Sequence, residues 1–102
     1  MPYISVRTCY PPTKINETVN VFLDVQKKYP PDAGLMKTLV PTAVCGTLDG
    51  VEALSVYEVE RNKLGDALLR VSKVMAEYRR IEGCYYEIKT WLTTEESIST
   101  LT

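Results

Sequence analysis

The spacing of apolar residues changes along the chain between a period of two and a helical period, and the order of these changes limits the fold. Strand patterns cover residues 3–10, 35–48, 51–60 and 84–92, and helical patterns cover residues 14–29 and 63–80. The sequence therefore predicts the order strand, helix, strand, strand, helix, strand.

Local signals mark the ends of these elements. Pro11-Pro12 ends the first strand, and Thr13 is suited to cap the helix that follows. Pro30-Pro31 stops that helix, because proline lacks the N–H that continues it. Asn62 is placed to cap the second helix, and Gly83 to end it. Beyond the last strand, Thr93 and Glu96 have the spacing of a capping box, which indicates a short helix in the tail.

The two middle strands are predicted to form a hairpin. Asp49-Gly50 lies between them, and Asp-Gly favours a two-residue turn whose central residues both have positive φ. Pro41 lies inside the first of these strands. It cannot donate a hydrogen bond to a neighbouring strand, so this strand is expected at an edge of the sheet.

Two β-α-β halves of this length predict an α+β, ferredoxin-like βαββαβ fold. We expect a four-stranded antiparallel sheet of order 4-1-3-2 with both helices on one face. At 102 residues the chain has the length of a single domain, 1–102, with a core over about residues 3–92 and residues 93–102 as a tail or short helix.

Strand parity assigns side chains to the two faces of this sheet. The face under the helices is predicted to carry Ile4, Val6, Cys45, Leu54, Val56, Tyr86 and Ile88. The helix-free face is predicted to carry Tyr3, Ser5, Arg7, Cys9, Val44, Leu48, Ala53, Ser55, Tyr57, Tyr85, Glu87, Lys89 and Trp91. Between the first and last strands, setting Arg7 opposite Glu87 also sets Tyr3 opposite Trp91, which matches a charge pair and an aromatic pair together.

Charge argues against nucleic acid and membrane as partners. The formal net charge is -1, and no apolar stretch approaches the roughly 20 residues that span a bilayer. Stacking of single-stranded RNA on the aromatic face is a further alternative. However, the strand of residues 51–60 has no lysine or arginine and ends in Glu58-Val59-Glu60.

The chain contains no histidine, which removes the commonest general base and metal ligand. Cys9, Cys45 and Cys84 are widely spaced and form no CxxC pair, so no zinc or redox motif is present. No secretory signal is visible at Met1, so we expect reduced thiols and a cytoplasmic protein. Cys45 is expected in the core. We expect no metal and no cofactor.

The element order from Tyr3 to Leu92, with its aromatic helix-free face, resembles the dimeric α+β barrel superfamily. Members include small cofactor-free monooxygenases, isomerases and haem-handling proteins. The resemblance is architectural, with no specific sequence motif behind it. Members that use a histidine as base or haem ligand have no counterpart here, so the resemblance does not extend to haem degradation or to His-Asp hydrolase-like and dehydrase-like activities.

Two functions remain open from the sequence. In the first, a homodimer binds an apolar or aromatic small molecule between sheet and helices, with cofactor-free oxygenation or isomerisation as the chemistry. Arg7 would anchor an anion, Glu87 would act as base or orienting group, and Tyr57, Tyr85 and Trp91 would form walls beside Cys9. In the second, the same face serves only for homo-oligomerisation of a non-enzymatic interaction or regulatory domain. There Arg7 and Glu87 form an ion pair and the rings are interface residues.

Overall fold

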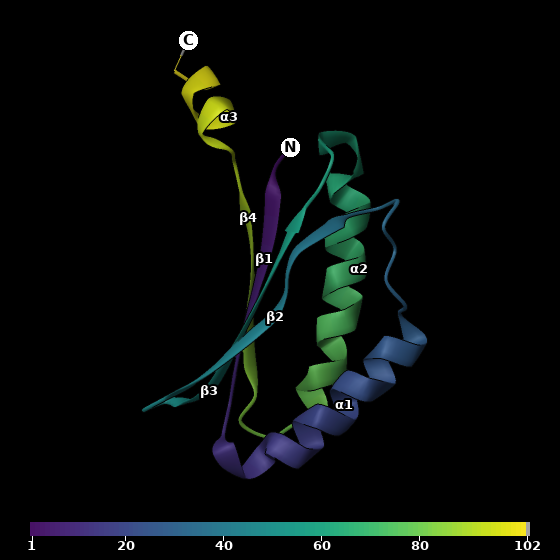
Figure 1. Ribbon diagram of the computed structural model, residues 1–102, viewed down its shortest axis with the longest axis vertical. Helices are drawn as coiled ribbons and strands as arrows, with labels where there is room; N and C mark the ends of the chain where they lie inside the picture. Colours follow the sequence, from purple (N-terminus) through teal and green to yellow (C-terminus); the bar gives the residue numbers. More distant parts are fainter. Residues whose placement is uncertain (102) are drawn as a thin grey trace.

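The computed structural model describes residues 1–101 and confirms the predicted order of elements. Four strands and two principal helices make up the domain, and three 3-10 turns and a short C-terminal helix join or extend them (Figure 1). Their bounds are β1 Tyr3–Tyr10, η1 Pro12–Lys14, α1 Ile15–Lys28, β2 Lys37–Thr47, β3 Gly50–Glu58, η2 Arg61–Lys63, α2 Leu64–Ala76, η3 Glu77–Arg80, β4 Tyr85–Trp91 and α3 Thr94–Ser99.

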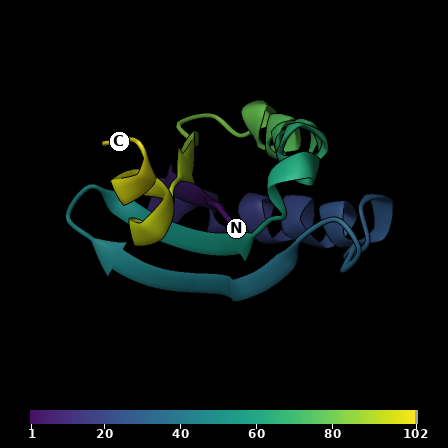
Figure 2. The same ribbon diagram turned by 90° about the horizontal axis from the view of Figure 1, so that it is seen from above.

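The strands form one antiparallel sheet in the order β2-β3-β1-β4, which is the predicted order 4-1-3-2 counted from the other edge. The strand that contains Pro41 is at an edge, as its missing N–H requires. Figure 2 shows α1 and α2 on the same side of the curved sheet. The fold is therefore α+β and ferredoxin-like, with one covered face and one helix-free face.

The predicted register between β1 and β4 is confirmed. Arg7 lies opposite Glu87, and Tyr3 lies opposite Trp91. On β1, the buried residues Ile4, Val6, Thr8 and Tyr10 alternate with Tyr3, Ser5, Arg7 and Cys9. The helix side of this strand is thus fixed by burial, and the other side belongs to the helix-free face.

The predicted faces of β2 and β3 were wrong. Burial of Val6 fixes the neighbouring strand, because its cross-strand partner Ser55 must point to the helices with it. Ala53, Ser55 and Tyr57 therefore lie under the helices, whereas Leu54, Val56 and Cys45 are on the helix-free face. Val44 also faces the helices, and Leu48 is in the hairpin loop. Cys45 is exposed and is not a core residue.

The hairpin turn is displaced by one residue from its predicted position. Thr47 pairs with Gly50, so the two loop residues are Leu48 and Asp49. Among the described residues, only glycines have positive φ, so Asp49 does not adopt the predicted turn conformation. In β2, register shifts between Thr38 and Val40 and between Val40 and Ala43 break the alternation of side chains near the proline.

Both principal helices begin through a 3-10 turn and not through a side-chain cap. Thr13 lies inside η1 and Asn62 inside η2, and no side-chain hydrogen bond caps either helix. The buried side of the helices joins the sheet in one core cluster, Ile4, Val6, Val21, Val25, Val59, Ala67, Val71, Met75, Tyr78 and Ile81. Gly83 has φ of +79° and lies in the turn beyond the end of η3, whose C-cap residue is Ile81.

The C-terminal tail forms the predicted capped helix. The backbone N–H of Glu96 donates to the Thr93 hydroxyl over 3.1 Å, and the N–H of Thr93 donates to the Glu96 carboxylate over 2.9 Å. Within residues 1–101, none of the helices has the length and apolar character needed to cross a membrane.

Candidate functional site

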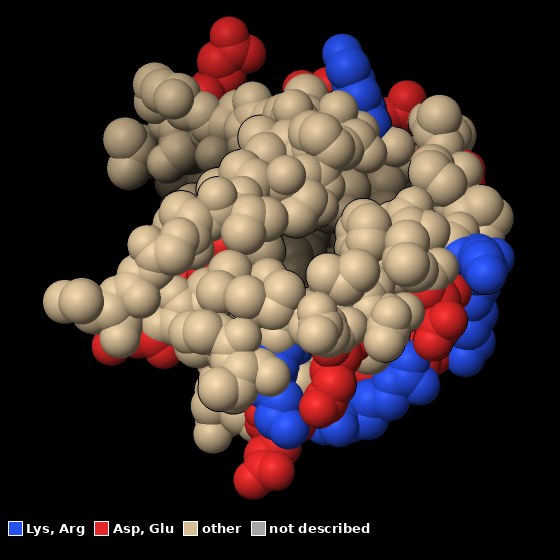
Figure 3. Space-filling model, turned by 60° about the horizontal axis from the view of Figure 1, so that its bottom comes forward, with Lys and Arg blue, Asp and Glu red and all other residues tan. Residues whose placement is uncertain are grey.

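A cavity of about 400 Å³ lies between the helix-covered face of the sheet and the two principal helices, and we call it the cleft. Its wall is formed by side chains of β1, α1, β2, β3 and α2, with Met36 and Tyr78 from the adjoining segments. Figure 3 shows the hollow from outside, rimmed by uncharged side chains. The volume is within the usual range of small-molecule sites, about 300–1,000 Å³.

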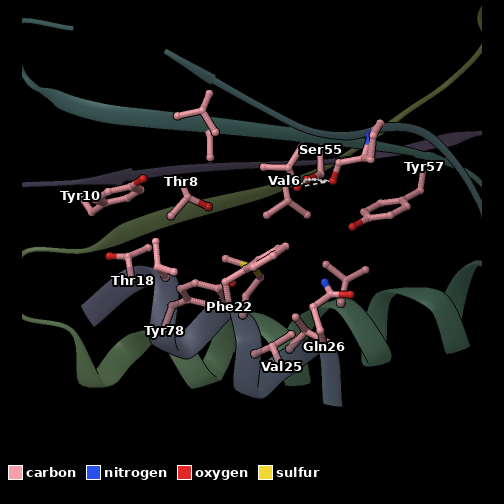
Figure 4. A pocket seen from close by; sticks show the side chains of 18 of the residues that line it. Val6, Thr8, Tyr10, Thr18, Phe22, Val25, Gln26, Ser55, Tyr57 and Tyr78 are labelled. Atoms are coloured by element: carbon pink, nitrogen blue, oxygen red, sulfur yellow. Dashed lines mark hydrogen bonds between the residues drawn. The ribbon is translucent and has the colours of Figure 1, made fainter. Parts of the chain in front are cut away.

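The middle of the cleft is apolar. Val6 of β1 faces the Phe22 ring of α1, and Val25 lies on the α1 side (Figure 4). Met75 of α2 adds a thioether to the lining. Phe22 remains 39% exposed, although it lies on the helix face toward the sheet. A large aromatic ring left partly in solvent beside an empty volume is a surface that a ligand could cover.

Polar groups lie toward the two ends of the cleft. In Figure 4, Gln26 and Tyr57 are near one end, and Thr8, Tyr10 and Thr18 are near the other. The Thr18 hydroxyl is already used, because it donates to the Lys14 carbonyl over 2.8 Å.

The irregular part of β2 adds a pair of hydroxyls to the cleft wall. The hydroxyl oxygens of Thr42 and Ser55 are 3.2 Å apart, and the Ser55 hydroxyl donates to the Pro41 carbonyl, also over 3.2 Å. Thr42 donates to the same carbonyl. The register shifts of β2 thus bring Pro41 and Thr42 into the wall of the cleft, opposite α1.

Two phenols of the cleft are held in the neutral form. Burial raises the pKa of Tyr78 to about 12, and burial also raises the pKa of Tyr10. The nearby Cys84 thiol shifts in the same direction, because its pKa is raised by burial and then by Cys9. At neutral pH these phenols are protonated, so they can donate hydrogen bonds but cannot serve as anions.

The described lining of the cleft contains no Asp, Glu, Lys or Arg, and the chain has no histidine. The site therefore offers an apolar volume with neutral donors and acceptors. Within residues 1–101 there is also no group of three or more Cys, Asp or Glu side chains arranged to hold a metal ion.

Most of the residues predicted to form a site lie on the opposite side of the sheet from the cleft. Arg7 is on the helix-free face and forms an ion pair with Glu52 of β3, with 2.8 Å between Nη2 and Oε1. The hydrogen bond with Glu52 and the charge of its carboxylate raise the pKa of Arg7 above its usual value. Glu87 lies opposite Arg7 in register, but its carboxylate pairs with Lys89 over 3.3 Å. The predicted Arg7–Glu87 ion pair is thus replaced by two others.

The remaining candidates divide between the faces. Cys9, Tyr85 and Trp91 share the helix-free face with Arg7. Trp91 donates from Nε1 to the Ser5 hydroxyl over 2.7 Å, and the Cys9 thiol donates to the Asp49 carbonyl over 4.0 Å. Tyr57 alone is in the cleft.

Several cleft residues were not identified from the sequence, including Phe22, Gln26, Tyr10 and Tyr78. Phe22 and Gln26 are four residues apart and so lie on one side of α1. Tyr10 has the same strand parity as the core residue Val6. These patterns indicated the covered side of each element, but they could not show that an unfilled volume lies there.

Comparison with known proteins shows the fold alone. No protein-family model matches the chain, and no curated protein matches it. Solved structures of similar fold include the de novo designed protein Foldit4, with a TM-score of 0.56 and 10% identity over 90% of this chain and 97% of that chain. Another is a protein from Deinococcus radiodurans described as a "putative antibiotic biosynthesis monooxygenase", with a TM-score of 0.58 and 10% identity over 91% of this chain and 92% of that one.

These similarities confirm the predicted ferredoxin-like α+β architecture and show nothing beyond the fold. They do not carry an activity, because a designed protein has a similar fold and one fold hosts many functions. Function has to be argued from the cleft and from the helix-free face.

Proposed function

We propose that this domain binds an apolar or aromatic small molecule in the cleft between the sheet and helices α1 and α2. The observation that carries the proposal is the volume of about 400 Å³ with a largely apolar lining. The partly exposed ring of Phe22 gives a ligand an apolar surface to cover.

Any reaction in the cleft would rely on neutral hydroxyls and on the reactivity of the ligand itself. Arg7 and Glu87, the residues that the sequence favoured as anion anchor and base, are on the other face of the sheet. Among the predicted site residues, Tyr57 is the one placed to contact a ligand in this cleft. The fold similarity to a protein described as a monooxygenase is compatible with such chemistry but does not supply its residues.

Fluorescence titration with N-phenyl-1-naphthylamine, an uncharged apolar probe, tests the proposal. We expect saturable binding to the wild-type protein and its loss in Ala53→Phe, because Ala53 lines the cleft and a ring there would fill the volume. Ala43→Phe is the matched control, since Ala43 lies opposite Leu54 on the helix-free face of the same hairpin. An absence of saturable binding to the wild type, or equal binding by both variants, would contradict the proposal.

A second candidate function concerns the helix-free face. Tyr85 is 76% exposed, Trp91 49% and Leu54 40%, and all three are on this face. We propose that two copies of the chain pack these faces together as a homodimer, because exposed apolar patches of this kind commonly mark interfaces. The cleft lies on the other side of the sheet, so dimerisation and ligand binding are compatible.

Cys9, Cys45 and Cys84 are free thiols, which fits the expected cytoplasmic location.

A further inference from the structure

The electrostatic character of the cleft limits the class of ligand that it can accept. The described residues that line it include no side chain that is charged at neutral pH. An ion moved from water into such a site loses hydration and gains no counter-charge, which is unfavourable unless it is paired. Figure 3 shows the charged side chains outside the rim of the hollow.

The ion pair between Arg7 and Glu52 on the sheet does not supply the missing counter-charge. Arg7 points to the helix-free face and is already paired with Glu52. The sheet separates its guanidinium from the cleft. A carboxylate bound among the apolar side chains around Phe22 would therefore be unpaired.

The cleft nevertheless holds donors that have no partner within the protein. Every fully buried side-chain N or O atom of residues 1–101 has a hydrogen-bond partner. The Tyr57 hydroxyl and the Gln26 amide make no hydrogen bond to any other described group, so they are not fully buried and are open to the cleft or to solvent. In Figure 4 the Tyr57 ring extends into the cleft with its hydroxyl toward the interior, and Gln26 lies below it on α1.

We propose that the ligand is an uncharged apolar molecule with a hydrogen-bond acceptor such as a ketone oxygen. The Tyr57 hydroxyl donates to this oxygen beside Gln26, and carboxylates are rejected. This inference depends on the proposed binding function of the cleft and specifies the chemistry of its ligand. The acceptor end would lie between β3 and α1, and the apolar body would extend past Phe22 toward Val6. The protonated phenols Tyr10 and Tyr78 are consistent with this, because they add further neutral polar groups to the wall and no charge.

Three naphthalenes of similar size separate charge from hydrogen bonding: 2-acetylnaphthalene, 2-naphthoate and 2-ethylnaphthalene. Their dissociation constants are measured at neutral pH by displacement of N-phenyl-1-naphthylamine and by calorimetry. We expect the ketone to bind at least about tenfold more tightly than the carboxylate, since even a partial desolvation penalty is of that order. Naphthoate binding as tightly as the ketone would overturn the rejection of anions.

The role of Tyr57 is tested in Tyr57→Phe. Loss of one neutral hydrogen bond should weaken the ketone by about three- to tenfold and leave the hydrocarbon within about twofold of wild type. Tyr3→Phe removes a hydroxyl from the helix-free face and should change no affinity. Equal loss for ketone and hydrocarbon would mean that Tyr57 is only a wall, contrary to the inference. If none of the three compounds nor the fluorescent probe binds the wild type, the cleft is not a ligand site and the proposed function fails with it.

Discussion

Gly50 lies at the start of β3, where the backbone of the β2–β3 hairpin is close to the end of β1. Its φ is +140°, and a Cβ added there would lie 2.6 Å from the carbonyl oxygen of Tyr10. That oxygen belongs to the backbone of a central strand, so it cannot move aside as a flexible side chain could. We therefore expect Gly50→Ala to lower the free energy of unfolding by about 1–3 kcal/mol, measured by urea denaturation.

Gly46, in the same hairpin, provides the matched control for this prediction. A Cβ at Gly46 would meet no atom within 4 Å, and the residue does not have positive φ. Gly46→Ala should leave stability unchanged or raise it by about 0.5–1 kcal/mol, because glycine in a strand carries an entropic cost. If the two variants have the same stability, the close approach to Tyr10 is not the constraint.

Glu96 ties the short C-terminal helix to the body of the domain. The backbone N–H of Thr93 and then Arg61, at 2.6 Å, lower the pKa of Glu96 from 4.5 to about 2. Because the folded pKa is below the unfolded one, this carboxylate stabilises the fold fully above about pH 4.5 and loses the contribution as the pH falls toward 2.

We therefore predict that Glu96→Gln is less stable than wild type near neutral pH, and that the difference largely disappears near pH 2. Urea denaturation at several pH values measures this difference. Glu95→Gln, on the exposed side of the same turn, is the control and should not show the same pH-dependent loss. A Glu96→Gln deficit that is constant across this pH range would show that packing, and not charge, explains the contribution.

The strands show which parts of the architecture the sequence could predict. The alternation of β1 is unambiguous, since Ile4 and Val6 contrast with Ser5 and Arg7, and its bounds and its register with β4 were predicted correctly. In β3 both parities contain apolar residues: Leu54 and Val56 on one side, and Val51, Ala53 and Tyr57 on the other. Here the pairing with β1 decides the faces, and no local pattern reports that pairing.

The candidate site was less predictable than the fold for the same reason. Inverting the faces of β2 and β3 placed Tyr57 beside Arg7, although the sheet separates them. The register shifts around Pro41 further change which β2 side chains reach the cleft. An unfilled volume depends on how far α1 lies from the sheet, and this is a property of packing across the whole core.

Helix α1 packs into the core on one side and lines the cleft on another, and one valine from each side allows the two to be compared. Val21 is 4% exposed and belongs to the core, whereas Val19 is 48% exposed and lines the cleft. Val21→Ala should lower the free energy of unfolding by about 1.5–3 kcal/mol through lost burial and a residual cavity. Val19→Ala should change it by less than about 0.5 kcal/mol but weaken binding of the fluorescent probe. Equal destabilisation by both variants, measured by urea denaturation, would show that the cleft side of α1 is packed in the same way as its core side.

The domain is more extended than its length requires. The Cα radius of gyration is 14.8 Å, against about 13 Å for a compact domain of 100 residues. The tip of the β2–β3 hairpin extends past the helices, and α3 projects at the opposite end (Figure 1). Within residues 1–101 no helix or strand covers the helix-free face between them, although it carries Tyr85, Trp91 and Leu54. A second copy of the chain would cover this surface.

We predict that the wild-type chain sediments as a dimer and that Trp91→Arg shifts it toward the monomer. The substitution removes an aromatic contact and adds a positive charge beside Lys89, whose ammonium is 5.4 Å from the Trp91 ring centroid. Trp91 also donates a hydrogen bond to Ser5, so Trp91→Arg alone could change the sedimentation by destabilising the monomer. Tyr85→Arg avoids this problem because Tyr85 is 76% exposed. Leu69→Arg, at a 56% exposed position on α2, is the control and should remain dimeric. If both aromatic variants sediment like the wild type, the helix-free face is not the dimer interface. A stable interface buries about 1,200–2,000 Å², and one centred on this face would be weakened by a charge at either position.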